Sequence, residues 1–171
     1  MLSKNYYAVS FRYTDETYRS IENFRENEKL IINSPTPIGR KIPRFIKMEN
    51  EEQAKRPKIF IFEMNNTQNI VMNIIWLSMK QPKQKEYKIH TKKYYNRFSY
   101  FGKSIVERNS LTDPFHVFIM EYIDFVLFKG KDHSKRASGF TLFPKKKIIN
   151  TNEIIMEFIK EVFNIHDDVS N

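Results

Sequence analysis

Two apolar segments separated by five polar residues constrain the fold of this chain more than any other feature. Residues 58–64, KIFIFEM, have the composition of a β-strand, and residues 70–79, IVMNIIWLSM, are apolar enough to be buried on both faces of a sheet. Residues 65–69, NNTQN, have the composition of a turn, because asparagine tolerates positive φ and its side chain bonds its own backbone. The sequence therefore predicts an antiparallel β-hairpin.

Further strands are expected on both sides of this hairpin. The segment YYAVSF within residues 1–11 predicts a first strand. The segments EYKIH (86–90) and NRFSYFGKSIVE (96–107) continue the β pattern, with aromatic side chains alternating against polar ones. GFTLF (139–143) predicts one more strand. Residues 32–43 hold three prolines and a glycine and predict a loop or an extended segment.

Three segments have helical signals. Residues 14–30 show helical spacing, and the threonine at position 14 is a suitable cap. Asp113 and Pro114 begin a second helix, because Asp caps and Pro is tolerated at the first helical position; its predicted apolar stripe is Phe115, Phe118, Ile119, Tyr122, Phe125 and Val126. Asn150 and Glu153 open a third helix, with a predicted face of Ile154, Ile155, Phe158, Ile159, Val162 and Phe163.

These elements predict an α+β fold with a curved, mainly antiparallel sheet or small β-barrel and two or three packed helices. At 171 residues and 40% hydrophobic content the chain fits one domain, residues 1–171, with a frayed C-terminal tail at about residues 166–171. No apolar run is long enough to predict a membrane span. The absence of cysteine excludes disulfides and thiolate metal sites, and favours an intracellular or virion-interior setting over secretion.

Positive charge is concentrated in two segments. The formal net charge is +9, yet residues 80–108 carry nine basic and two acidic residues, and residues 129–147 carry seven basic and one acidic residue. The remainder of the chain is therefore acidic. This asymmetry favours one basic face that binds an anionic partner over lysines spread for solubility. The alternative is a pair of solvated lysine-rich loops.

The predicted nucleic-acid contacts come from both segments. The second segment supplies residues for phosphate binding, namely Lys131, His133, Lys135, Arg136, Lys145, Lys146 and Lys147. In the first segment, YYNRFSYFGK places aromatic rings beside cations, the combination that base stacking and backbone contact require. Tyr95, Arg97 and Lys103 are the residues predicted to extend the surface.

Two motifs allow other chemistry. His133 beside an aspartate and two cations could serve as a general base, but histidines and carboxylates are not spaced for a metal site. Glu63, Asn65 and Asn66, at the end of an apolar strand, could bond a nucleobase edge or simply mark where the strand meets its turn. We predict no cofactor and no metal. Trp76 is expected in the core rather than on a stacking surface.

Four motifs in the order PRFIKME, IFIFEMNNTQN, YYNRFSYFGK and FKGKDHSKRASGFTLFP resemble an uncharacterised protein family of the large nucleocytoplasmic DNA viruses. The resemblance covers residues 42–144 and implies a viral origin without a mechanism. The family pattern leads us to expect glycine where this chain has Asn73, Ile75 and Ala137. If those glycines admit a ligand to the backbone, the pocket is altered here. The order of elements is also similar to small-barrel folds such as PUA and EVE-like domains.

Three functions are compatible with these observations. The first is a non-enzymatic domain of viral origin that binds RNA or DNA. The second is a minor structural or virion protein whose basic face meets an acidic protein surface. The third is an enzyme that acts on a nucleotide or nucleic acid through Glu63 or His133.

Overall fold

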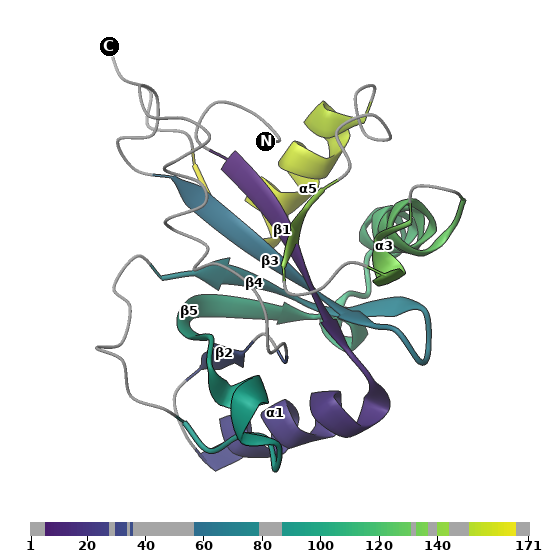
Figure 1. The fold of residues 1–171 in the computed structure, drawn as a ribbon. Coiled ribbons are helices and arrows are strands. Elements are labelled where there is room, and N and C mark those ends of the chain that lie inside the picture. Colours follow the sequence, from purple (N-terminus) through teal and green to yellow (C-terminus); the bar gives the residue numbers. More distant parts are fainter. Residues whose placement is uncertain are drawn as a thin grey trace.

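The computed structural model describes residues 6–27, 30–33, 35, 57–78, 87–130, 133–136, 140–143 and 151–166. Its centre is a curved six-stranded sheet in the order β2-β5-β4-β3-β1-β6 (Figure 1). The strands are β1 (Tyr6–Tyr13), β2 (Ile31–Asn33), β3 (Lys58–Asn65), β4 (Ile70–Leu77), β5 (Ser99–Glu107) and β6 (Thr141–Leu142). Only β1 and β3 pair in parallel among these strands, so the prediction of a mainly antiparallel sheet is confirmed.

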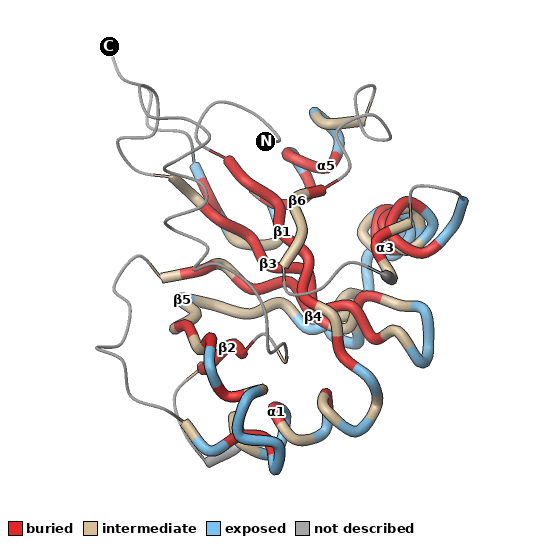
Figure 2. The backbone as a smooth tube through the Cα atoms, in the orientation of Figure 1, coloured by how far each residue is buried: buried red, intermediate tan, exposed pale blue. Residues whose placement is uncertain are grey.

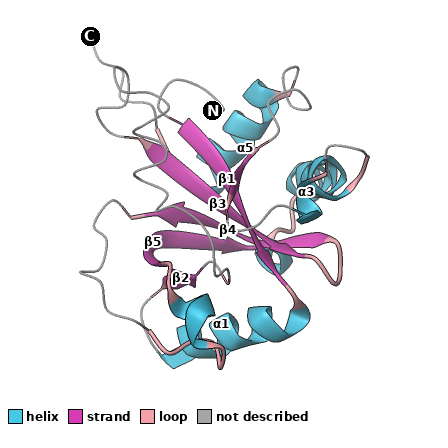
Figure 3. Cartoon of the chain, viewed as in Figure 1, coloured by secondary structure: helices cyan, strands magenta, loops and turns pink. Residues whose placement is uncertain are grey.

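In the described part of the chain, three α-helices cover the two faces of the sheet, in agreement with the two or three that the sequence predicts (Figures 1 and 3). They are α1 (Asp15–Asn27), α3 (Pro114–Phe128) and α5 (Asn152–Val162). The helix α1 lies on one face, and α3 and α5 lie on the other. No helix in the described part of the chain is long and apolar enough to cross a membrane.

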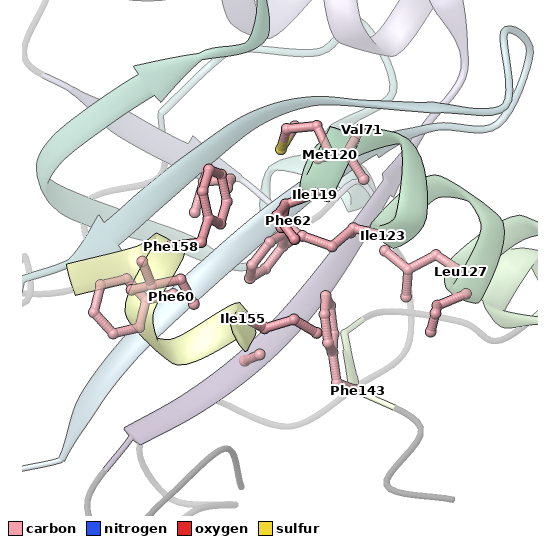
Figure 4. Packing of buried hydrophobic residues seen from close by; sticks show 14 of the residues in the cluster. Phe60, Phe62, Val71, Ile119, Met120, Ile123, Leu127, Phe143, Ile155 and Phe158 are labelled. Carbon is pink, nitrogen blue, oxygen red and sulfur yellow. The ribbon is translucent and has the colours of Figure 1, made fainter. Parts of the chain in front are cut away.

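Each face of the sheet has its own hydrophobic core. Alternate residues of β3 point to opposite faces: Phe60 and Phe62 pack against α3 and α5, whereas Ile59 and Ile61 pack on the α1 side. Figure 4 shows the first core, and Figure 2 shows that β1 and β3 are buried along almost their whole length. These two neighbouring strands are therefore covered on both faces.

The predicted hairpin is confirmed. The strands β3 and β4 pair antiparallel around a turn at residues 66–69. Asn69 has a φ of 60°, the left-handed conformation that asparagine accepts at low cost. The side chain of Asn65 closes the turn by accepting hydrogen bonds from the backbone N–H groups of Thr67 and Gln68 at 3.0 and 3.2 Å.

The first two predicted helix starts are also observed. The hydroxyl of Thr14 accepts a hydrogen bond from the Thr17 N–H at 3.3 Å, which caps α1. Asp113 accepts bonds from the Phe115 and His116 N–H groups at 2.8 and 3.2 Å, with Pro114 at the first helical position. The helix α5 has Thr151 at its N-cap, while the predicted cap, Asn150, lies outside the described residues.

The predicted apolar face of α3 is partly wrong. Phe118 and Phe125 are 62% and 64% exposed and Phe115 is 48% exposed. The buried residues are Ile119, Met120, Ile123, Val126, Leu127 and Phe128. Because α3 is apolar around most of its circumference, periodicity alone does not identify the face that meets the sheet. In α5, similarly, Ile154 is exposed and Met156 is buried in its place.

The prediction of a strand at the EYKIH motif is wrong. Residues 87–90 form no strand, and a 3₁₀ helix, η1 (Lys93–Asn96), precedes β5, which begins at Ser99. Asn96 explains the change, because its buried amide accepts bonds from the backbone N–H groups of Ile89 and His90 and donates to the His90 carbonyl. These local bonds replace a sheet ladder.

Gly102 in β5 provides a test of the packing at the sheet edge. A Cβ atom at this position would lie 2.5 Å from Leu30 Cδ2 and 2.8 Å from Ile75 Cγ2. We expect Gly102→Ala to lower the free energy of unfolding by about 1–3 kcal/mol through overpacking. Urea denaturation measures this loss, and Ser104→Ala on the same strand is the control. Equal stability of the two variants would contradict the packing described here.

Candidate functional site

Glu63 is fully buried at the centre of a polar network on the α1 face of the sheet. Its carboxylate receives two hydrogen bonds from Arg25 of α1, at 2.6 and 2.8 Å. The Tyr13 hydroxyl lies 3.0 Å from the same carboxylate, and the Asn73 amide donates to it at 2.9 Å. The network thus joins α1, β1, β3 and β4 through one charge.

The charges in this network are fully paired, which makes their burial tolerable. Burial lowers the pKa of Arg25, but the charge and hydrogen bonds of Glu63, together with Tyr13 and Tyr18, raise it, so the pKa lies above its ordinary value. Burial and the charge of Glu63 both raise the pKa of Tyr13. The guanidinium therefore stays charged and the phenol stays neutral. The structure assigns Glu63 a bonded, structural position rather than a free ligand contact.

A cavity of about 430 Å³ opens beside this network, between α1 and the paired ends of β4 and β5. Its lining residues are Tyr18, Glu22, Arg25, Met72, Asn73, Ile105, Glu107, Arg108 and Asn109. Neither Glu63 nor His133 is among them, so the cavity does not support an enzyme that pairs these two residues.

A β-bulge shapes the cavity wall. In the pairing of β3 with β4, Glu63 lies opposite Asn73 but Met64 lies opposite Val71, which leaves Met72 as an extra residue. The freed backbone of Val71 is bonded by side chains instead: its N–H donates to Asp124 at 2.6 Å, and its carbonyl accepts from Arg108 at 3.1 Å. Arg108 and Asp124 also form an ion pair at 2.8 Å. This arrangement holds Met72 and Asn73 at the cavity.

The asparagines that follow Glu63 have structural partners. The Asn65 amide donates to Asp15 at 2.8 Å, which joins the turn to the start of α1. The Asn66 amide donates to the Lys135 carbonyl at 3.1 Å. Together with Glu63 they stabilise the sheet end and its neighbouring loops, and none of the three lines the cavity.

The basic loop after α3 is only partly described. Ser134–Arg136 form a 3₁₀ helix, η3, which is attached to β1 because Arg12 donates to the Ser134 carbonyl and to the Thr141 hydroxyl. Lys135 reaches Asn69 of the hairpin turn, and the half-buried His133 accepts a 3.3 Å bond from the Lys135 N–H. The remaining predicted phosphate contacts lie outside the described residues or their described side chains: Lys131, Arg136, Lys145, Lys146 and Lys147.

A second basic surface surrounds η1, and we call it the η1 patch: Lys92, Lys93, Tyr94, Tyr95 and Arg97. The rings of Tyr94 and Tyr95 meet edge to face at 4.7 Å, and Lys92 lies 5.7 Å from the Tyr95 ring. No carboxylate occurs in the sequence from residue 87 to 106. Tyr94 is 50% exposed, whereas the predicted stacking residue Tyr95 is half-buried.

The η1 patch is supported from below by buried polar groups. His90 bonds Asn33 of β2 at 2.8 Å, and Asn33 donates to the Phe98 carbonyl and the Ser99 hydroxyl. Burial lowers the pKa of His90 to about 4, so this imidazole is neutral at physiological pH and adds no charge to the patch. Buried hydrogen bonds therefore hold the segment that carries the two tyrosines in place.

The η1 patch and Lys135 lie toward opposite ends of β5. The η1 patch precedes Ser99 at the start of the strand, whereas Glu107 at its end pairs with Asn73 beside the hairpin turn that Lys135 contacts. Lys103 lies between them, with Nζ 3.6 Å from the centre of the half-buried Trp76 ring, which packs on the core as expected. The structure thus places Tyr95 beside Lys92 and Tyr94, and Arg97 over the nearby Phe98 ring, whereas Lys135 lies with Asn66 in a separate group.

Sequence reasoning missed the residues that line the cavity. Tyr18 and Arg25 lie seven residues apart on α1, which places them on one face of the helix, but a charged amphipathic helix gives no sign of a site. The only signal was at position 73, where glycine was expected. The described residues contain no group of three or more His, Cys, Asp or Glu that could hold a metal ion.

No protein-family model and no curated protein sequence matches the chain. Among solved structures, the Pho92 YTH domain in complex with m6A is similar with a TM-score of 0.48 and 11% identity, over 97% of this chain and 90% of that one. The YTH domain of the Zygosaccharomyces rouxii MRB1 protein in complex with N6-methyladenosine RNA gives 0.41 and 11%, over 88% and 86%. Similarity at this level assigns neither a family nor a ligand.

Proposed function

We propose that the chain is a non-enzymatic domain that binds single-stranded nucleic acid. The observation that carries the proposal is the η1 patch, where the rings of Tyr94 and Tyr95 are in contact, Lys92 lies beside Tyr95, and Lys93 and Arg97 are exposed on the same short segment, which is held by buried polar groups. Cations neutralise phosphates and exposed rings stack on bases, which is the combination found on single-strand binding surfaces. A solvated loop requires neither the hydrogen bonds by which the buried Asn96 holds Ile89 and His90 nor two tyrosine rings in contact.

The net charge of +9 supports the same conclusion, because it attracts a polyanion from a distance. Lys103, which lies over the Trp76 ring, and Lys135, which contacts the hairpin turn, add further positive charge. Viral origin stays a prediction that follows from the sequence resemblance, and an intracellular or virion-interior setting stays one that follows from the absence of cysteine.

Affinity for short RNA and DNA strands at several salt concentrations tests the proposal. We expect binding that weakens steeply as salt rises, and Lys92→Ala combined with Arg97→Ala should reduce the slope of log K against log salt by about 2. The control is Arg19→Ala combined with Lys160→Ala, which removes the same charge from α1 and α5. RNA with one N6-methyladenosine and the unmodified strand are compared in parallel.

Absence of binding at low salt would overturn the proposal, as would equal slopes for the two double variants. A stable oligomer that buries the exposed phenylalanines of α3, together with no affinity for nucleic acid, would favour the alternative of an interaction protein.

A further inference from the structure

Two hydrogen-bonding groups beside the cavity have no partner in the described part of the chain. The Asn73 side chain is among the buried polar groups, and its amide nitrogen donates to Glu63 at 2.9 Å and to the Tyr18 oxygen at 2.8 Å. These two bonds use both amide hydrogens. The Asn73 carbonyl oxygen and the hydroxyl proton of Tyr18 are left over, and both residues line the cavity.

The ion pair fixes which of these groups donates and which accepts. An ionised carboxylate only accepts, so the Asn73 atom that faces Glu63 is the nitrogen, and its oxygen is directed elsewhere. Because the second amide hydrogen goes to the Tyr18 oxygen, the Tyr18 proton also has to point away from Asn73. Burial, chiefly, together with the charge of Glu63 raises the pKa of Tyr18, so this proton is retained. One acceptor and one donor therefore stand side by side at the cavity.

The charges around the cavity exclude a phosphate. Arg25 is already paired with Glu63 and Arg108 with Asp124. Glu22 and Glu107 also line the cavity and have no cationic partner among the described residues. With four carboxylates around two guanidinium groups, the cavity favours a neutral ligand that carries N–H donors.

We propose that this cavity receives one unpaired nucleobase, whose adjacent donor and acceptor bind the Asn73 oxygen and the Tyr18 hydroxyl. Each nucleobase presents such an adjacent pair on the edge that is occupied by the partner strand in a duplex, so the site selects single strands. Met72 and Ile105 supply apolar walls, and the volume suffices for one flat heterocycle. The inference rests on the proposed function and names the chemistry of its base contact.

The cavity and the η1 patch are placed so that one continuous nucleic-acid strand can contact both. Both lie on the face of the sheet that α1 covers, and they are at the two ends of β5, about 25 Å apart by the rise of a β-strand. An RNA or DNA strand with one base in the cavity would bring its phosphates to the cations of the η1 patch.

Free nucleosides, which carry no phosphate, test the cavity separately from the basic surface. The protein is labelled with ¹³C at its methionine methyl groups and titrated with adenosine, guanosine, cytidine and uridine at millimolar concentration. We expect the Met72 signal to shift with at least one nucleoside while the buried Met120 on the α3 face does not. Tyr18→Phe should weaken that binding about tenfold by removing one hydrogen bond, and Tyr122→Phe, which loses a hydroxyl bonded to Thr151 in the other core, is the matched control.

If no nucleoside shifts Met72, or if Tyr18→Phe and Tyr122→Phe bind equally, the cavity proposal is overturned, whether or not oligonucleotides bind. If nucleosides bind at Met72 but oligonucleotide affinity does not depend on salt, the cavity stands and the η1 patch loses its role. Ile105→Phe fills the cavity without touching the bonds of Asn73, and it should abolish the Met72 shift.

Discussion

Replacing Arg25 by methionine is expected to lower the free energy of unfolding by about 3–5 kcal/mol, because the variant leaves the Glu63 charge buried without its cation. Glu63 is completely buried, and its bonds to Tyr13 and Asn73 do not neutralise it. The loss is measured by urea denaturation monitored by circular dichroism.

A second substitution separates the charge from the packing. Adding Glu63→Gln to Arg25→Met removes the unpaired charge and should restore part of the lost stability, since glutamine still accepts from the remaining donors. Lys160→Met provides the control for an exposed pair, the one with Glu157, and should cost less than about 1 kcal/mol. Equal losses for Arg25→Met and Lys160→Met would mean that the buried network contributes little.

Phe62→Ala is expected to cost a similar amount, about 3–5 kcal/mol, for a different reason. The Phe62 ring is fully buried between the sheet and the helices α3 and α5, and its centre lies 4.5 Å from that of Phe143 next to β6 (Figure 4). Its removal leaves a cavity that rigid neighbours on several elements cannot fill.

The exposed ring of Phe118 on α3 is the matched control for Phe62. Phe118→Ala should change the free energy of unfolding by no more than about 0.5 kcal/mol, because the side chain makes few contacts and is 62% exposed. A loss at Phe118 as large as that at Phe62 would show that the exposed face of α3 is covered in solution.

Features that form between residues close in the sequence could be predicted from the sequence. The hairpin, the cap at Thr14 and the cap at Asp113 are each formed within a few residues, and all three are observed. The buried face of α3 and the path of residues 87–96 depend on packing partners far along the chain. Periodicity therefore could not choose among the many apolar residues of α3, or recognise the Asn96 clamp.

The candidate site was harder to predict because its parts are distant in sequence. Arg25, Glu63 and Asn73 come from α1, β3 and β4, and only the sheet register places them together. An expected glycine drew attention to position 73 as a possible loss of a pocket. In the structure this residue instead lines a cavity, and its side-chain oxygen has no partner among the described residues. Whether Asn73 removes a pocket or helps to form one could be decided only from its hydrogen-bond partners.

The order of the strands also determines when the sheet can be completed. The strand β1 is an early segment of the chain, yet it is flanked by β3 and β6, and Val9 pairs with Leu142. During synthesis, the apolar β1 leaves the ribosome long before either partner exists. Its backbone donors and acceptors stay unpaired until β3 arrives, and one edge stays open until residues 141–142 follow. A nascent chain on a ribosome that stalls before that point exposes an apolar strand with an unpaired edge. We expect chaperones to bind such chains.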